Sequence, residues 1–270
     1  MAANKKKPAK IVTHPYLTGS PVDSRSLKSA LSLFVTYLII TLLYLVVASV
    51  LLMDTPWIRI ALCVAVLAMT WLMLFLSGQS RGTDAVDYGE KLWLRQEKGL
   101  TIEEKERKLC YHPLKGFVQA FMGVIPFFLC AVALSATATL QRTGLTPLPS
   151  WLSSYEAQEE IGKPLAFYHV SSGLSLEGIL RLIIRLHLMP WVSLFNSANA
   201  SAMLTMERIS PLLTLIAPVF YGIGYTRGVA VRTQVHTAIA ANDRKRRNVQ
   251  KKQIRARRAA RQPRQPEQLN

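Results

Sequence analysis

Four long stretches of the chain carry no charged side chain, and they dominate its pattern of hydrophobic and polar positions. The charge-free stretches are residues 29–53, 60–80, 116–141 and 209–226. About 20 residues of helix cross the ~30 Å hydrocarbon core of a bilayer, so each stretch is long enough to span a membrane. Backbone groups in lipid must bond one another, and the period-two alternation of a barrel strand is absent. The pattern therefore predicts an all-α integral membrane protein.

We expect four transmembrane helices and one further amphipathic helix at the outer interface. The predicted spans are approximately 29–53, 57–77, 116–141 and 208–226. The first should be a retained anchor, because 28 residues precede it and no small-residue cleavage pattern follows it. The link at 54–56 is so short that the first two spans should form an antiparallel hairpin.

The basic residues predict the orientation of these spans. The chain has 33 Lys and Arg against 16 Asp and Glu, and 27 of the 33 lie before the first span, between spans two and three, or after span four. The positive-inside rule places all three of these regions in the cytoplasm. The resulting division is a basic N-terminal tail (1–28), a membrane domain (29–226) and a polybasic C-terminal tail (227–270), with both termini cytoplasmic. The plan favours a prokaryotic plasma membrane.

The segment 174–195 is apolar enough to resemble a fifth span, but it carries charge. Glu177, Arg181 and Arg185 recur every four residues and form one charged stripe, with spacing that favours Glu-to-Arg pairing. A charge at the bilayer centre costs ~2.5–3.5 kcal/mol on insertion scales, which argues against a crossing. We expect an interfacial helix in the outer leaflet with snorkelling arginines, bent or ended at Pro190. A re-entrant hairpin broken at Pro190 is the alternative.

The connections between spans predict further local structure. The cytoplasmic segment 78–115 should hold one helix from about Thr83 to Gly99, a usual C-terminal residue, and a second that opens at Thr101 and stops before His112. The outer region 142–207 contains the interfacial helix. It also contains Glu156, Glu159 and Glu160, which we interpret as solvated because no calcium-loop pattern accompanies them.

The C-terminal tail carries the strongest signal outside the spans. Eleven of the 21 residues from 244 to 264 are Lys or Arg and none is acidic. Such a charge density should not fold by itself, and it attracts anionic lipid of the inner leaflet. RNA would attract the same charges, but the tail has no aromatic residue for stacking on bases, so lipid contact is favoured. The expected lipid-contacting residues are Arg244, Lys245, Arg246, Arg247, Lys251, Lys252, Arg255, Arg257 and Arg258.

The chain shows no pattern of catalytic, cofactor-binding or metal-ligating residues. Cys110 and His112 lack two further ligands for zinc, and no nucleotide-binding or hydrolase motif occurs. Asn199 begins a three-residue glycosylation sequon. Two pairs of small residues, Gly116 with Ala120 and Gly224 with Gly228, favour close helix packing.

We expect a non-enzymatic, membrane-anchored interaction or assembly protein that uses its basic tail against lipid or a protein partner. One alternative is a small-solute transporter or permease component, for which the candidate cavity residues are Tyr37, Tyr44, Gln119 and Tyr221. A second alternative is a lipid-processing enzyme at the outer interface, using Glu177 and His187. These two residues are ten positions apart, ~15 Å along a helix, which argues against the pair acting together.

Overall fold

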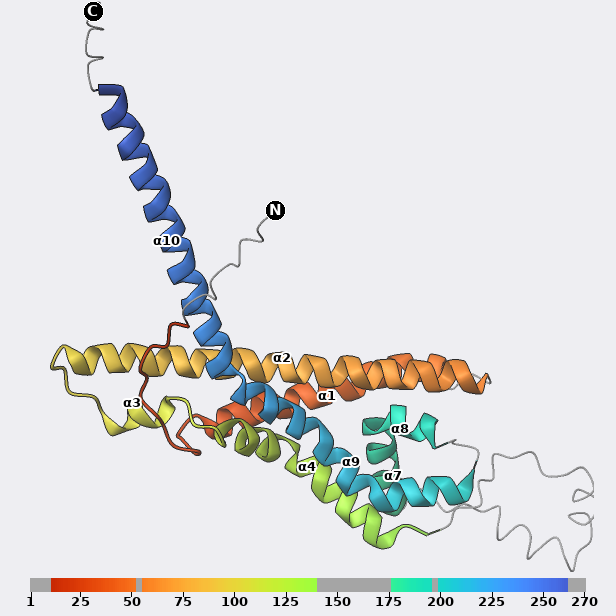
Figure 1. Ribbon diagram of the computed structural model, residues 1–270. Helices are drawn as coiled ribbons and strands as arrows, with labels where there is room; N and C mark the ends of the chain where they lie inside the picture. Colours follow the sequence, from red (N-terminus) through yellow and green to blue (C-terminus); the bar gives the residue numbers. More distant parts are fainter. Residues whose placement is uncertain (1–10, 52–54, 140–175, 196–198, 262–270) are drawn as a thin grey trace, which may run out of the picture.

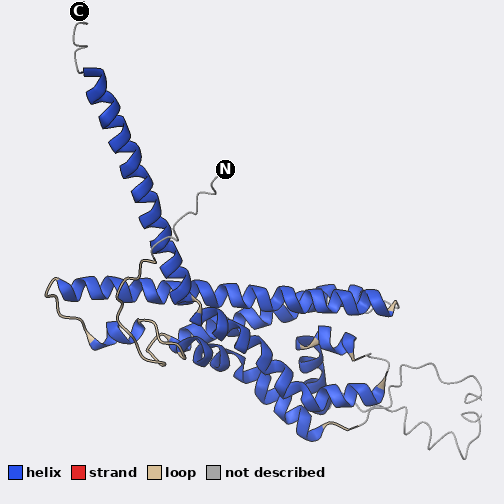
Figure 2. Ribbon diagram, viewed as in Figure 1, coloured by secondary structure: helices blue, strands red, loops and turns tan. Residues whose placement is uncertain are grey.

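The computed structural model describes residues 11–51, 55–139, 176–195 and 199–261, and these residues contain helices and no strand (Figure 2). The helices are α1 (Ser26–Leu51), α2 (Pro56–Glu97), α3 (Glu104–Leu109), α4 (Lys115–Thr137), α7 (Leu176–His187), α8 (Met189–Leu194), α9 (Ala200–Thr226) and α10 (Gly228–Arg261). Four of them, α1, α2, α4 and α9, are long and apolar enough to cross a membrane. These are the helices that the four charge-free stretches predict.

The four long helices run between two ends of one bundle (Figure 1). At the end that we call the basic end, α1 and α4 begin, α9 ends and α10 departs. At the opposite end, which we call the loop end, α1 and α4 finish and α2 and α9 start. Helix α9 packs against both α2 and α4, and α1 packs against α4. Toward the loop end, α7 packs against α1 and α4, and α8 packs against α1 and α2.

The outside of the bundle is apolar. On α1, α2, α4 and α9, large aliphatic and aromatic side chains face outward, among them Val46, Met69, Leu129 and Leu212, each more than 60% exposed. An apolar band on this scale is not stable in water, because soluble proteins rarely expose contiguous apolar patches larger than a few hundred Å². The band is the surface that hydrocarbon would cover.

Helix α2 differs from the prediction because it continues without a break through the expected end of the second span. The Thr83 hydroxyl donates to the Gln79 carbonyl inside the same helix, so it does not cap a new one. The predicted stop at Gly99 is confirmed: Gly99 has φ +77°, and the N–H groups of Gly99 and Leu100 donate to the Gln96 and Arg95 carbonyls.

The second helix of segment 78–115 is shorter than predicted. Helix α3 starts at Glu104, and its N-cap residue is Glu103, which makes no side-chain capping bond. The capping box that we predicted from Thr101 is therefore wrong, and residues 101–103 are extended chain or loop instead. The predicted stop before His112 agrees with the end of α3 at Leu109.

Close packing of small residues joins α2 to the end of α9. A methyl group added at Gly224 would lie 2.0 Å from the Phe75 carbonyl oxygen, and one added at Gly228 would lie 2.3 Å from the Gly82 backbone. Ala120 is fully buried, and a methyl group at Gly116 would meet the Tyr225 side chain. The packing role predicted for these small-residue pairs is confirmed, and Gly78 and Gly82 of α2 supply the facing surface.

The fourth long helix begins eight residues before the predicted start. Asn199 is its N-cap, since the side-chain oxygen accepts from the N–H groups of Ser201 and Ala202. The sequon asparagine is therefore used to begin α9. This earlier start places Glu207 in the second turn of a long apolar helix, whereas we had assigned it to the outer connection.

Helix α10 also differs from the prediction, because the basic tail is helical as far as Arg261. The chain changes direction at Arg227, and α10 then extends away from the bundle (Figure 1). We expected that the charge density would prevent folding. Lys, Arg, Gln and Ala are strong helix formers. Every described side chain from Asn242 to Arg257 is exposed, so repulsion between the like charges is screened and the helix can form.

Candidate functional site

The predicted charged stripe of Glu177, Arg181 and Arg185 lies on one face of α7, as the four-residue spacing requires. That face is turned toward the protein. The Arg181 side chain is only 5% exposed, whereas Leu176, Ile179 and Leu182 on the other side of α7 are 39–75% exposed. A helix in water would show the reverse arrangement. The expectation of snorkelling arginines is therefore not met at Arg181.

The stripe converges on Glu207 of α9. The Glu207 side chain is 1% exposed. Its Oε2 accepts from Arg181 Nε at 3.1 Å, and its Oε1 accepts from Arg185 Nε at 2.9 Å. Arg181 Nη2 also contacts Glu177 Oε1 at 2.8 Å and donates to the Thr139 carbonyl. Two carboxylates and two guanidiniums form one network with no net charge.

This network ties α7 to the loop end of α9 and to the chain just after α4. A buried carboxylate without partners would cost several kcal/mol, and the two arginines supply partners for both oxygens of Glu207. Since each charged group has a partner, the arrangement fits a structural clamp. An Asn199 cap followed by helix-forming residues was the sequence signal that could have placed Glu207 in the helix.

Helices α7 and α8 enter the bundle from the loop end and return to it. Glu177 contacts Thr139 beyond the end of α4, whereas His187 stacks on Phe127 at 4.1 Å between ring centroids. Phe127 lies ten residues before the last residue of α4, about 15 Å along the helix axis. Trp191 of α8 then packs against Trp71 of α2. The break between α7 and α8 falls at Leu188, two residues before the predicted break at Pro190.

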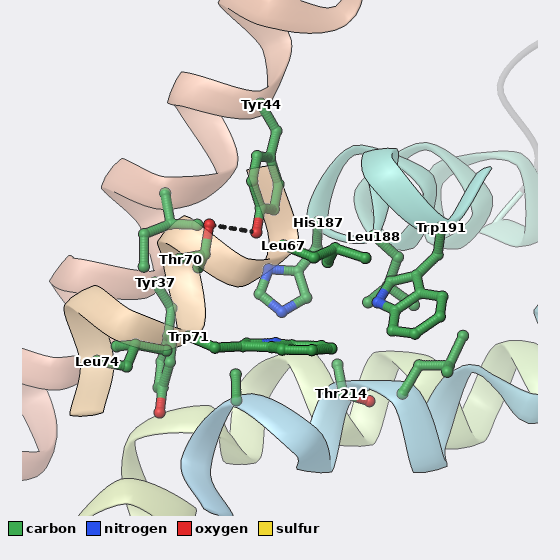
Figure 3. Close-up of a pocket in the computed structure, with 13 residues that line it drawn as sticks. Tyr37, Tyr44, Leu67, Thr70, Trp71, Leu74, His187, Leu188, Trp191 and Thr214 are labelled. Carbon is green, nitrogen blue, oxygen red and sulfur yellow. Dashed lines mark hydrogen bonds between the residues drawn. The ribbon is translucent and has the colours of Figure 1, made fainter. Parts of the chain in front are cut away.

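At the deepest point of this path, His187 lines a small cavity with a volume of about 30 Å³, which we call the His187 cavity. Figure 3 shows the imidazole projecting between Tyr44 and Trp71. The Thr41 hydroxyl donates to the Tyr37 carbonyl, so it accepts from His187 Nδ1 at 2.9 Å, and Nε2 is then the acceptor nitrogen. The volume suits about two water molecules.

Two tyrosines near this cavity have no partner for their hydroxyl groups. Tyr37, which lines the cavity, and Tyr221 of α9 are 1% and 0% exposed, and within the described chain neither hydroxyl makes a hydrogen bond. Both are among the candidate cavity residues predicted from the sequence. The structure places Tyr37 and Tyr44 at the His187 cavity, while Gln119 lines a different cavity at the basic end. Buried hydroxyls are normally hydrogen-bonded, so this region is suited to ordered water.

The nine predicted lipid-contacting residues all lie on α10 beyond its contacts with the bundle. The section 244–261 of this helix, which we call the basic arm, contains one further arginine, Arg261. The described side chains of the arm are exposed, and no ion pair neutralises any of them among the described residues. Helix α10 packs on α2 and α9 only near its start.

Charged contacts hold the start of α10 against α2. Arg232 Nε donates to Glu90 Oε2 at 2.9 Å and its Nη2 to Asp87, and His236 Nε2 lies 2.8 Å from Glu90 Oε1. The ring of His14 packs against that of His236 with centroids 4.2 Å apart. The N-terminal segment and α2 thus fix the direction in which the basic arm leaves the bundle.

A second buried ion pair lies at the basic end. Lys115, the first residue of α4, contacts Asp23 with N···O 2.5 Å, and its Nζ also donates to the Lys108 and Cys110 carbonyls. Burial alone would raise the pKa of the Asp23 carboxyl, but the hydrogen bonds from Lys115 and Ser26 outweigh it and hold the pKa below its ordinary value of 3.8. This pair anchors the chain before α1 to the start of α4.

The remaining candidate residues do not come together. Cys110 is buried, which raises the pKa of its thiol, while the His112 ring accepts from the Leu114 N–H. His187 and Glu177 engage different partners at opposite ends of α7. Glu156, Glu159 and Glu160 lie outside the described residues. Among the residues that the structure does describe, no three His, Cys, Asp or Glu side chains gather as metal ligands.

Comparison with known proteins gives no relative for this chain: no protein-family model, no curated protein and no solved structure matches it.

Proposed function

We propose that this chain is a non-enzymatic, membrane-anchored interaction protein of a prokaryotic plasma membrane, with both termini in the cytoplasm. In this proposal the bundle is the anchor, and the basic arm contacts anionic lipid of the inner leaflet or an acidic protein partner. The observation that carries it is the basic arm itself, a helix rich in Lys and Arg and without internal neutralisation.

The direction of α10 supports this proposal. If the four long helices are roughly perpendicular to the membrane, a helix that leaves α2 crosswise runs along the cytoplasmic surface rather than away from it (Figure 1). Charges near an anionic surface gain about 1 kcal/mol each, an attraction that decays within a Debye length. The contacts from Arg232 and His236 to Glu90 then hold the arm close to that surface. RNA contact is less well supported, because the arm has no aromatic residue.

The test places a fluorophore on the arm at Asn248→Cys, after replacement of the native cysteines, and reconstitutes the full chain into vesicles. Quenching by headgroup-labelled lipid should be strong with phosphatidylglycerol, weak with phosphatidylcholine alone, and reduced by 1 M salt. A variant in which the nine predicted residues are Gln keeps helix-forming side chains and should lose the difference between lipids. Equal quenching in both lipids, or no effect of the nine substitutions, would contradict lipid contact.

The protein-partner part of the proposal has its own test in cells. Cross-linking and recovery of the full chain should retrieve an acidic protein that the glutamine variant does not retrieve. If localisation, abundance and recovered proteins are all unchanged in that variant, the arm has no role in interaction and the proposal fails.

A small-solute permease is a second candidate, favoured by the buried and unpartnered hydroxyls of Tyr37 and Tyr221 near an interior cavity. A solute path through the bundle would need polar groups at this depth. Proteoliposomes tested with a panel of sugars, amino acids and phosphate esters should then show flux that Tyr37→Phe reduces. Absence of flux across the panel counts against it.

A further inference from the structure

A cavity of about 290 Å³ lies at the basic end of the bundle and takes no part in the function proposed above. We call it the Arg81 cavity. It is lined from several elements: Arg25 from the segment before α1, Arg81 and Asp84 from α2, and Gln119 from α4. Its size is close to the lower limit of ~300 Å³ for small-molecule sites, so it suits a ligand smaller than a nucleotide.

The charged groups around this cavity are unequally satisfied. Lys115 and Asp23 also line it, but they neutralise each other. Arg25, Arg81 and Asp84 are exposed residues. Within the described residues, no hydrogen bond or ion pair engages the Arg25 guanidinium or the Asp84 carboxylate, and Arg81 makes only a 3.4 Å bond to the Ser32 hydroxyl. The charges left for a ligand are therefore two guanidiniums and one carboxylate, an excess of one positive charge.

Gln119 adds a neutral polar group to the wall of the cavity. Its side chain is only 6% exposed, and no hydrogen bond to it is present in the described part of the chain. It is nevertheless among the residues that face the cavity. Its amide is therefore available to bond a polar ligand in the cavity.

We propose that the Arg81 cavity binds a phosphate ester of a small polyol. Guanidiniums prefer phosphate oxygens, which assigns the phosphate to Arg25 and Arg81. The hydroxyl groups at the other end of such a ligand donate to Asp84 and to the Gln119 carbonyl oxygen. Inorganic phosphate can bond only to Arg25 and Arg81. The Asp84 carboxylate and the Gln119 amide therefore favour a ligand that also carries hydroxyl groups.

This chemistry is present in two sources. A soluble ester such as sn-glycerol 3-phosphate carries it, and so does the headgroup of phosphatidylglycerol. The lipid source also depends on the membrane location proposed above, whereas the soluble source does not. Binding at the Arg81 cavity can therefore be tested independently of contact between the basic arm and lipid.

The test uses the full chain purified in detergent. Calorimetric titration measures binding of sn-glycerol 3-phosphate and of inorganic phosphate, and native mass spectrometry measures retention of phosphatidylglycerol against phosphatidylcholine. Arg81→Gln should weaken binding of the preferred probe by about tenfold, since it removes a charge-assisted hydrogen bond. Gln119→Leu should weaken it by about fivefold, and the matched control Arg95→Gln, on an exposed position of α2 away from the cavity, should leave it unchanged.

Asp84→Asn separates the two halves of the site. It should tighten binding of inorganic phosphate, because a nearby negative charge is removed, and it should weaken the preference for glycerol 3-phosphate over phosphate. Binding of the soluble ester supports a free metabolite as the source, and selective retention of phosphatidylglycerol alone supports a headgroup. If no probe binds, or if Arg81→Gln and Gln119→Leu variants with wild-type thermal unfolding bind as wild type does, the proposal is overturned.

Discussion

At the scale of single residues, Glu207 shows how an ionised side chain is accommodated inside an apolar bundle. Its two oxygens accept separately from Arg181 and Arg185, so both lone-pair regions face positive charge. In a pair this deeply buried, desolvation offsets much of the Coulomb attraction, and the net contribution to stability is small. Removal of one partner strongly destabilises the folded state, because the buried charges that remain have no opposite charge beside them.

Glu207→Gln should therefore lower the free energy of unfolding in detergent by about 3 kcal/mol, since two guanidiniums lose their common carboxylate. Denaturant titration followed by circular dichroism measures this. Glu177→Gln is the matched control: its side chain is 32% exposed, and its loss should cost no more than ~1 kcal/mol. Equal effects of the two substitutions would show that Glu207 is not the centre of the network.

Asp23 gives the chain a pH-dependent contribution at the basic end. Because its folded pKa lies below 3.8, the ionised carboxylate stabilises the folded state at all pH values above about 4, and this is lost as the pH falls through the lowered folded pKa. Asp23→Asn should lower the unfolding midpoint at pH 7, at a cost of about 2 kcal/mol.

The comparison of wild type with Asp23→Asn across pH measures this contribution. The difference between their unfolding midpoints should be constant from pH 7 to pH 5 and should shrink only below pH 4. A difference that already disappears between pH 5 and pH 7 would mean that another group carries the effect.

At the scale of helices, α2 and α9 approach closely because glycines line both sides of their contact. The carbonyl oxygen of Tyr225 lies 2.2 Å from where a methyl group on Gly82 would be, so any side chain there must push the two backbones apart. Between helices in lipid, such van der Waals packing replaces the hydrophobic driving force that is available in water.

Gly82→Ala should therefore destabilise the bundle by about 1–3 kcal/mol through overpacking, even though alanine favours helix more than glycine does. Thermal unfolding in detergent measures the loss. Ser80→Ala, at an exposed position of the same helix, should leave the midpoint within experimental error. A stabilising effect of Gly82→Ala would show that the close contact is absent in the membrane-protein fold.

At the scale of the whole molecule, four helices long and apolar enough to cross a membrane turn an apolar band outward. Helix α7 buries Arg181 and exposes Leu176, Ile179 and Leu182, and α1 and α2 also expose many large apolar side chains. We therefore expect that the chain stays in the membrane pellet at high salt and alkaline pH and is released only by detergent.

Orientation has a separate test. A single cysteine at Asn248 on the basic arm, with the native cysteines replaced, should react with a membrane-impermeant maleimide only after the cells are opened. Ser153→Cys in the connection between α4 and α7 should react in intact cells. The reverse result would place both termini outside and would refute the topology read from the Lys and Arg distribution.

The local pattern of the sequence was sufficient for the number of long apolar helices, for the stop at Gly99 and for the small residues of the helix contacts. Each of these depends on neighbouring residues: a run without charges, a residue that tolerates positive φ, or a spacing of four along a helix. The spacing also placed Glu177, Arg181 and Arg185 on one face of α7.

Only the tertiary structure decided what that face meets. Spacing cannot show whether an arginine faces lipid headgroups or a carboxylate 26 residues away, because the answer depends on how α7 packs against α9. The same holds for the pairs of Lys115 with Asp23 and of Arg232 with Glu90, whose partners are distant in the chain. Hydrophobicity is a property of each segment, whereas the neutralisation of a buried charge is a property of two segments brought together.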